Sequence, residues 1–209
     1  MSDPIAVTVS VDVDTTDPDP GVLALLLEHL ARRGLASTWF VRPDVDPALV
    51  RRVVGGGDEV GALCLTPDEL SPDLRDLDAL EARAVGARVL DLFGPVGVVP
   101  RDVRYVSSPD VEDEFGTHAR LRAPDPSVDL LTSPLVWLRS VQIGVGAALE
   151  RHLRFELRLD PAHLGTETGV SAAVEALDLL HGLVRAGRAG AATLGEVAAA
   201  LGTADTRDT

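Results

Sequence analysis

The sequence predicts an α/β fold, specifically a distorted or incomplete β/α barrel with about seven strands. The chain has 209 residues, of which 45% are hydrophobic and 25% are charged, as in ordinary globular domains. Short β-branched runs alternate with amphipathic segments along the chain, which indicates a parallel sheet with helical crossovers. We expect a single domain over residues 1–201, followed by a polar, frayed tail at 202–209.

The first half of the chain carries the clearest periodicity. β-branched runs of strand length predict strands over Ile5–Val13, Ala36–Val41 and Glu59–Leu65. Apolar residues at helical spacing predict helices over Gly21–Arg33, Pro47–Val54 and Leu74–Phe93. Glycines follow the first two helices, at Gly34 and at Gly55, as expected for helix ends.

The second half is less regular, and its expected elements follow in chain order. Val96–Val99 and Val103–Val106 are expected to form one strand or two, and Ala119–Ala123 and Val136–Ile143 to be extended. A short helix over Ala147–Leu153 and an alternating strand over Arg154–Leu159 come next. A long helix over Val170–Arg185 precedes a last strand and helix within Ala191–Leu201.

Composition excludes several classes of function. All 19 basic residues are arginine, so lysine Schiff-base and pyridoxal phosphate chemistry are excluded. The net charge of −14 argues against nucleic-acid and anionic-membrane partners. A single cysteine, Cys64, excludes an intramolecular disulfide and a four-cysteine zinc site. Without a recognisable secretion signal or a spanning apolar run, we expect a cytoplasmic protein.

Candidate site residues follow the predicted strands, because working residues of β/α barrels lie at the carboxyl ends of the strands. Asp12 and Asp14 lie on one side of the first strand, and two such carboxylates repel unless a cation or a proton lies between them. The alternative is that both stabilise the following turn. Arg104 lies in the fourth strand region and His163 follows the strand Arg154–Leu159. Together with the two aspartates they would form an acid–base site.

Several segments, in order, resemble the polysaccharide deacetylase family, which consists of carbohydrate esterases with a distorted β/α barrel. They include VTVSVDVD near the start, GVLALLLEHLARRGLASTWFV after it, PRDVRY in the middle, and LRLDPAHLG and TLGEVAAAL near the end. The resemblance implies that Asp12 is the general base, Asp14 a metal ligand and His163 the general acid. It also implies that Arg104 is the arginine that orients Asp12.

The same resemblance exposes a departure at the metal site. The two histidine ligands of the family correspond to Leu63 and Pro67 here, and neither side chain can bind a metal. A metal-independent acid–base enzyme for a small intracellular metabolite is therefore one hypothesis. A non-catalytic deacetylase-like binding protein is the second.

The third hypothesis is a metal-dependent hydrolase of amide or ester bonds with a rebuilt site, in which Asp14 acts with Asp58, Asp68 or Glu69. We expect no cofactor, apart from a weak residual divalent-metal site at Asp14. The expected partner is a small-molecule ligand or substrate, and the sequence leaves the oligomeric state open.

Overall fold

The computed structural model describes residues 4–14, 19–66, 69–79, 84, 86–90, 103–108, 119–122 and 133–205. Its strands are β1 (Ile5–Val13), β2 (Ser37–Val41), β3 (Glu59–Cys64), β4 (Gly86–Val89), β5 (Tyr105–Ser108), β6 (Ala119–Arg122), β7 (Phe155–Leu159) and β8 (Ala189–Ala191). Its helices are α1 (Pro20–Arg33), α2 (Pro47–Gly55), α3 (Leu70–Ala79), α4 (Pro134–Arg151), the 3-10 turn η2 (Pro161–Leu164), α5 (Glu167–Arg185) and α6 (Leu194–Asp205).

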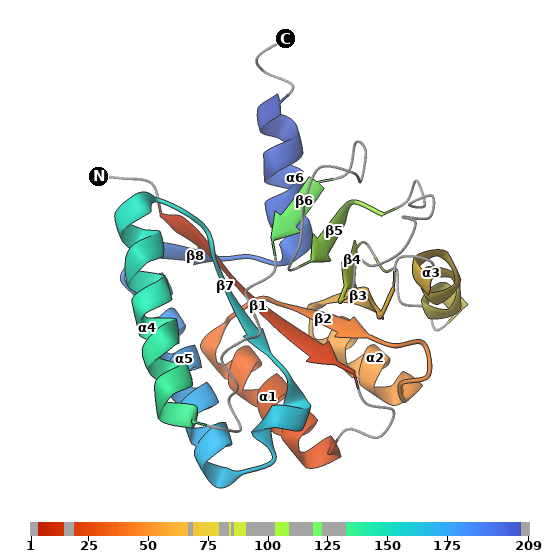
Figure 1. Ribbon diagram of the computed structural model, residues 1–209, viewed down its shortest axis with the longest axis horizontal. Helices are drawn as coiled ribbons and strands as arrows, with labels where there is room; N and C mark the ends of the chain where they lie inside the picture. The colour runs from red at the N-terminus through yellow and green to blue at the C-terminus, as the bar shows by residue number, and fades with distance from the viewer. Residues whose placement is uncertain are drawn as a thin grey trace.

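The strands form one curled parallel sheet, shown in Figure 1, in the order β6-β5-β4-β3-β2-β1-β7. Every strand pair in the described part of the chain is parallel. The short β8 pairs with the first residues of β1, on the same side of β1 that pairs with β2 nearer its carboxyl end. The curled sheet with crossover helices confirms the distorted, incomplete barrel predicted from the sequence.

Asp-Pro pairs begin three of the helical segments. Asp19 precedes α1, Asp46 precedes α2 and Asp160 precedes η2. In each case the aspartate side chain accepts a hydrogen bond from the backbone N–H two residues ahead. Proline fits the next position because its fixed φ suits a helix and its missing N–H has no partner in the first turn.

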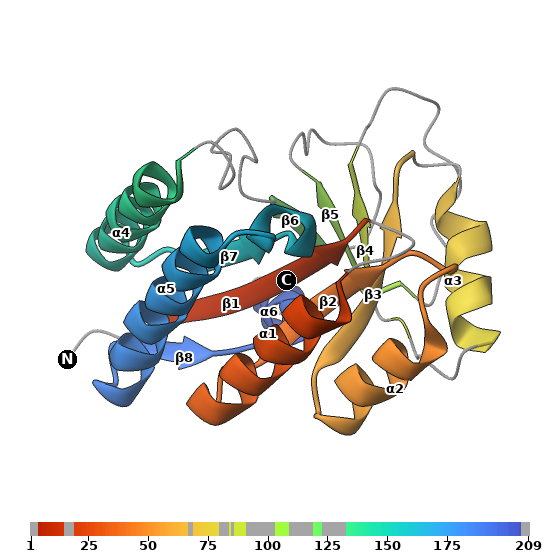
Figure 2. The same ribbon diagram turned by 90° about the horizontal axis from the view of Figure 1, so that it is seen from below.

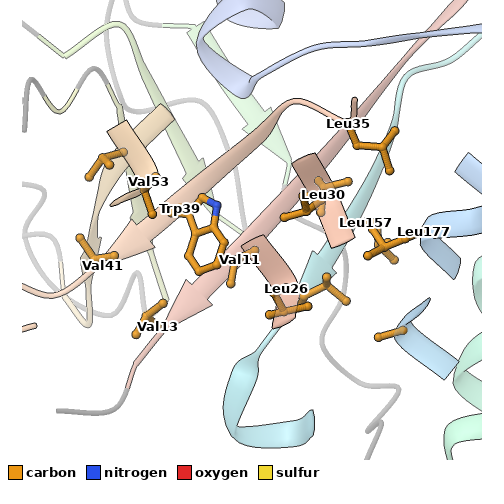
Figure 3. Packing of buried hydrophobic residues seen from close by; sticks show 14 of the residues in the cluster. Val11, Val13, Leu26, Leu30, Leu35, Trp39, Val41, Val53, Leu157 and Leu177 are labelled. Carbon is orange, nitrogen blue, oxygen red and sulfur yellow. The ribbon is translucent and has the colours of Figure 1, made fainter. Parts of the chain in front are cut away.

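The main core lies between the sheet and the helices α1 to α5. Figure 2 shows α1, α2 and α5 side by side along one face of the sheet. Alternate residues of β1 point into this core, including Val7, Val9 and Val11. Figure 3 shows Trp39 of β2 packed among Val11, Val41 and Val53. The other alternate residues of each strand therefore face the inside of the curl.

A second, smaller apolar cluster lies inside the curl, where α6 packs against the sheet. It contains Phe40, Leu63 and Tyr105 from three strands together with Leu194 of α6. The Tyr105 hydroxyl donates to Glu59 at 2.6 Å, and Glu59 also accepts from the hydroxyls of Thr38 and Thr193. The cluster extends along the strands, because Tyr105 begins β5 whereas Phe40 and Leu63 lie near the carboxyl ends of β2 and β3.

Two sequence predictions of secondary structure are wrong. The predicted helix Leu74–Phe93 contains β4, a short strand buried between β3 and β5, while helix α3 ends at Ala79. Apolar spacing alone cannot separate a short buried strand from a helical segment. The predicted extended segment Val136–Ile143 lies within α4, whose β-branched residues include exposed ones that obscure the helical pattern.

The short helix predicted over Ala147–Leu153 is the end of the longer α4, which begins at Pro134, and the other predicted elements among the described residues agree to within a few residues. The helix α6 continues to Asp205, beyond the expected start of the frayed tail at Gly202. The predicted strand Val96–Val99 and the last residues, 206–209, lie outside the described part of the chain. No helix of the described residues has the length and hydrophobicity needed to cross a membrane.

The close packing of Gly86 against Tyr105 predicts that Gly86→Ala lowers the stability of the folded protein. An added Cβ would lie 2.1 Å from Cζ of the buried Tyr105 ring, so the ring would have to move. We expect a loss of about 1–3 kcal/mol in the free energy of unfolding, measured by urea titration. Gly190→Ala in β8 is the matched control, because its Cβ meets no heavy atom within 4 Å. Equal stability of the two variants would contradict this packing.

Candidate functional site

Charged side chains from three strands meet inside the curl, next to the apolar cluster of α6. Asp12 comes from β1, Arg88 from β4, and Glu156 and Arg158 from β7. In the order of the sheet, β3 and β2 separate β4 from β1. Arg88 crosses them above Phe40, with its guanidinium carbon 4.4 Å from the ring centre. The curl of the sheet makes this crossing short enough for one side chain.

Asp12 is held by two arginines. Nη1 of Arg88 donates to Oδ1 at 2.8 Å and to Oδ2 at 3.1 Å. Nε of Arg158 donates to Oδ2 at 2.6 Å. Asp12 is only 2% exposed, so these ion pairs replace the water that a surface carboxylate would bind. Both carboxylate oxygens are therefore occupied by charged donors.

Arg88 is the centre of the network and is fully buried. Besides Asp12, it forms an ion pair with Glu156 and donates to the hydroxyls of Ser10 and Ser107, each at 3.2 Å. Burial disfavours the charged guanidinium, but the carboxylates of Asp12 and Glu156 outweigh burial and raise the pKa of Arg88. The guanidinium therefore stays charged inside the protein.

Glu156 joins the network to the protein surface. Its Oε1 accepts a hydrogen bond from the Ser10 hydroxyl at 2.8 Å. Its Oε2 lies 3.5 Å from Nη1 of Arg154, whose side chain is partly exposed. Two donors in the network, Nε of Arg88 and Nη1 of Arg158, are buried without a hydrogen-bond partner. Such orphaned donors are rare in folded proteins and mark places where a ligand or water can bind.

The expectation that Arg104 orients Asp12 is corrected by this geometry. Both oxygens of Asp12 are bound by Arg88 and Arg158, while Arg104 is exposed just before β5. Arg88 was missed because its segment was expected to be helical. The signal for Arg158 was present, since the strict alternation of FELRL puts Glu156 and Arg158 on one face of β7.

Asp14 and His163 lie near the same edge of the sheet. Asp14 is exposed directly after β1, and His163 belongs to η2, which follows β7 and packs against β1. The backbone thus places His163 near the carboxyl ends of β1 and β7. Its side chain lies outside what the structure describes.

The rebuilt metal site cannot include Asp58. This residue precedes β3, whereas Asp14 follows β1, so in a parallel sheet they lie at opposite edges. Asp58 instead accepts from the backbone N–H and the hydroxyl of Ser37, at 2.9 and 2.7 Å. Burial raises the pKa of Asp58, and the two hydrogen bonds oppose that shift. Across the described residues, no three His, Cys, Asp or Glu side chains are grouped to hold a metal ion.

Leu63 and Cys64 are both fully buried at the end of β3. Leu63 faces the inside of the curl and belongs to the apolar cluster of α6. Cys64 faces the main core, where burial raises the pKa of its thiol. A thiol of this kind stays protonated, so Cys64 is not an activated nucleophile.

Comparison with known proteins identifies the fold. No protein-family profile matches the sequence, and no curated protein matches it significantly. Solved structures do match. A protein from Pseudomonas aeruginosa described as a polysaccharide deacetylase superposes with a TM-score of 0.72 at 12% identity, over 93% of this chain and 89% of that one. The chain has the fold of the polysaccharide deacetylases.

Two further structures extend this polysaccharide-deacetylase comparison. A Mycobacterium smegmatis protein described as a polysaccharide deacetylase has a TM-score of 0.68 at 17% identity and covers 94% of this chain and 89% of its own. A CE4-family pseudoenzyme from Bacillus anthracis has a TM-score of 0.56 at 17% identity, over 93% of this chain and 66% of that one. At such identities the shared property is the fold alone.

Arg88→Met is expected to destabilise the protein strongly, because it leaves Asp12 and Glu156 buried with fewer partners. The expected loss is about 3–5 kcal/mol in the free energy of unfolding, measured by urea titration. Arg104→Met is the matched control, because this residue is exposed, and it should change stability by less than about 0.5 kcal/mol. A larger effect at Arg104 than at Arg88 would contradict this account of the network.

Proposed function

We propose that this chain is a non-catalytic, deacetylase-like binding protein in which the network around Asp12 holds the barrel together. The observation that carries the proposal is the double ion pair of Asp12 with Arg88 and Arg158. A general base needs a carboxylate oxygen that can reach a substrate proton. Here both oxygens are engaged and the side chain is buried.

The two arginines also argue against Asp12 as a proton acceptor on chemical grounds. A proton transferred to Asp12 would leave Arg88 and Arg158 facing a neutral partner inside the protein. The competing acid–base hypothesis, with Asp12 as base and His163 as acid, would have to offset this cost.

The zinc ion of the deacetylase family does not fit the residues present. Leu63, at one of the two histidine positions, is buried among apolar side chains and offers no ligand. Asp14 alone provides too few ligands for a stable site. We therefore assign no metal-dependent step to this chain.

A structural neighbour supports the idea that a protein can keep this fold without catalytic activity. The matched Bacillus anthracis protein is described as a CE4-family pseudoenzyme. A deacetylase-like barrel thus exists in a form that is named for lacking the enzyme's activity. The present chain would be a further case, in which the charged residues around Asp12 stabilise the interior of the protein.

Asp12→Asn separates the structural hypothesis from the catalytic one. If Asp12 neutralises Arg88 and Arg158, its loss costs about 3–5 kcal/mol of stability and lowers the melting temperature by roughly 10 °C. Asp14→Asn, the exposed neighbour, should melt like the parent. An Asp12→Asn protein with parental stability but no turnover of an identified substrate would refute the proposal and favour acid–base catalysis.

The chemistry of the network also suggests the ligand. The Arg158 side chain is 17% exposed, and its Nη1, itself buried, has no hydrogen-bond partner. A carboxylate oxygen on a small molecule could accept that hydrogen bond, because guanidinium and carboxylate groups match in charge and geometry. The proposed ligand is therefore a small organic anion.

A thermal-shift titration with sodium acetate and sodium malonate tests this ligand class. Binding to the folded state should raise the melting temperature beyond that in sodium chloride of equal ionic strength. The rise should vanish in Arg158→Gln and persist in Arg104→Gln, each compared with its own ligand-free melting point. The same shift in chloride, or a shift retained by Arg158→Gln, would count against Arg158 as the anion site.

A further inference from the structure

Helix α4 forms an outer edge of the molecule. Figures 1 and 2 both show it beyond α5, with no other described element on its outer side. Its inner face, which includes Trp137, Val141 and Val145, packs into the main core. The opposite face carries large apolar side chains, with Leu135 79%, Val136 57% and Ile143 61% exposed. Leu153, directly beyond the helix, is 54% exposed.

The exposed apolar residues within the helix lie on one face because of helical periodicity. Val136, Arg139, Ile143 and Glu150 are separated by three, four and seven residues, the spacing of a continuous stripe. Gly146 lies within the stripe, and a Cβ placed there would meet no heavy atom within 4 Å. The stripe thus has a large side chain at Ile143 and open space above the backbone at Gly146.

The stripe is complementary to the stripe of a second copy that is related to the first by a two-fold rotation and therefore runs antiparallel. A two-fold axis between Gly144 and Val145 brings unlike positions of the two helices together. The resulting pairs are Val136 with Leu153, Arg139 with Glu150, and Ile143 with Gly146. One rotation thereby matches apolar with apolar, positive with negative, and large with small.

The charge of α4 also favours a second copy. The whole chain carries a net charge of −14, so most approaches of two copies are repulsive. The charged residues of α4 are Arg139, Glu150 and Arg151, and the helix is therefore not acidic. Contact through this helix keeps self-repulsion low and allows an Arg139–Glu150 ion pair in each direction.

We propose that the α4 stripe is a self-association surface through which two copies pair as antiparallel helices. This proposal does not depend on the network around Asp12. A single helix pair buries less surface than a standard stable interface. The pairing should therefore be weak and reversible, with a dissociation constant on the order of tens of micromolar.

Sedimentation velocity from about 5 to 500 µM tests the proposal. The mass should rise from that of one 22.0 kDa chain toward twice that value as concentration increases. Ile143→Asp and Gly146→Leu should each weaken association at least about tenfold, with unchanged melting temperatures. Val54→Asp on α2 is the control, because Val54 is also exposed, at 47%, and lies far from the stripe in sequence.

A charge exchange tests the antiparallel register. Arg139→Glu and Glu150→Arg should each weaken association, because each places like charges in contact across the axis. The two changes combined should restore parental association. A monomeric parent at every concentration, or a dimer that tolerates Ile143→Asp, would overturn the proposal. Failure of the combined variant to recover association would overturn the register and with it the α4 pairing.

Discussion

The structure depends on the burial of one positive charge, the guanidinium of Arg88, inside the curl of a parallel sheet. A buried unpaired charge costs several kcal/mol, so the fold is stable only if carboxylates accompany it. Asp12 and Glu156 supply them from β1 and β7. Because these strands are distant from β4 in the sheet order, the ion pairs also join parts of the sheet that share no backbone hydrogen bonds.

This arrangement divides the inside of the barrel into two neighbouring regions with different roles. The cluster of α6 fills one region with apolar side chains, including Leu63, where the deacetylase family has a metal ligand. The charged network lies beside it, since Asp12 is in register with Phe40 and Arg88 with Leu63, and the exposed Asp14 lies at the carboxyl ends of the strands. The residues nearest the expected active site are thus part of the interior packing, which ties their chemistry to the stability of the fold.

The sequence predicted the fold class because β1, α1, β2, α2, β3 and α5 carry strong periodicity and clear end signals. It did not predict β4, since a four-residue strand beside amphipathic segments has no distinct period. It misassigned α4, whose outer face carries large apolar side chains among its charged and polar ones. Asp12 was found from the alternation of β1. Its partner Arg88 was not, because pairing across the sheet depends on its curl, which no local pattern encodes.

A double-mutant cycle between Asp12 and Arg88 tests the central claim most directly. The free energies of unfolding of the parent, Asp12→Asn, Arg88→Met and the combined variant give the coupling between the two side chains. If the buried pair holds the barrel together, the coupling should be about 2 kcal/mol or more, with the second change costing much less than the first. Additive effects, with a coupling near zero, would contradict the account.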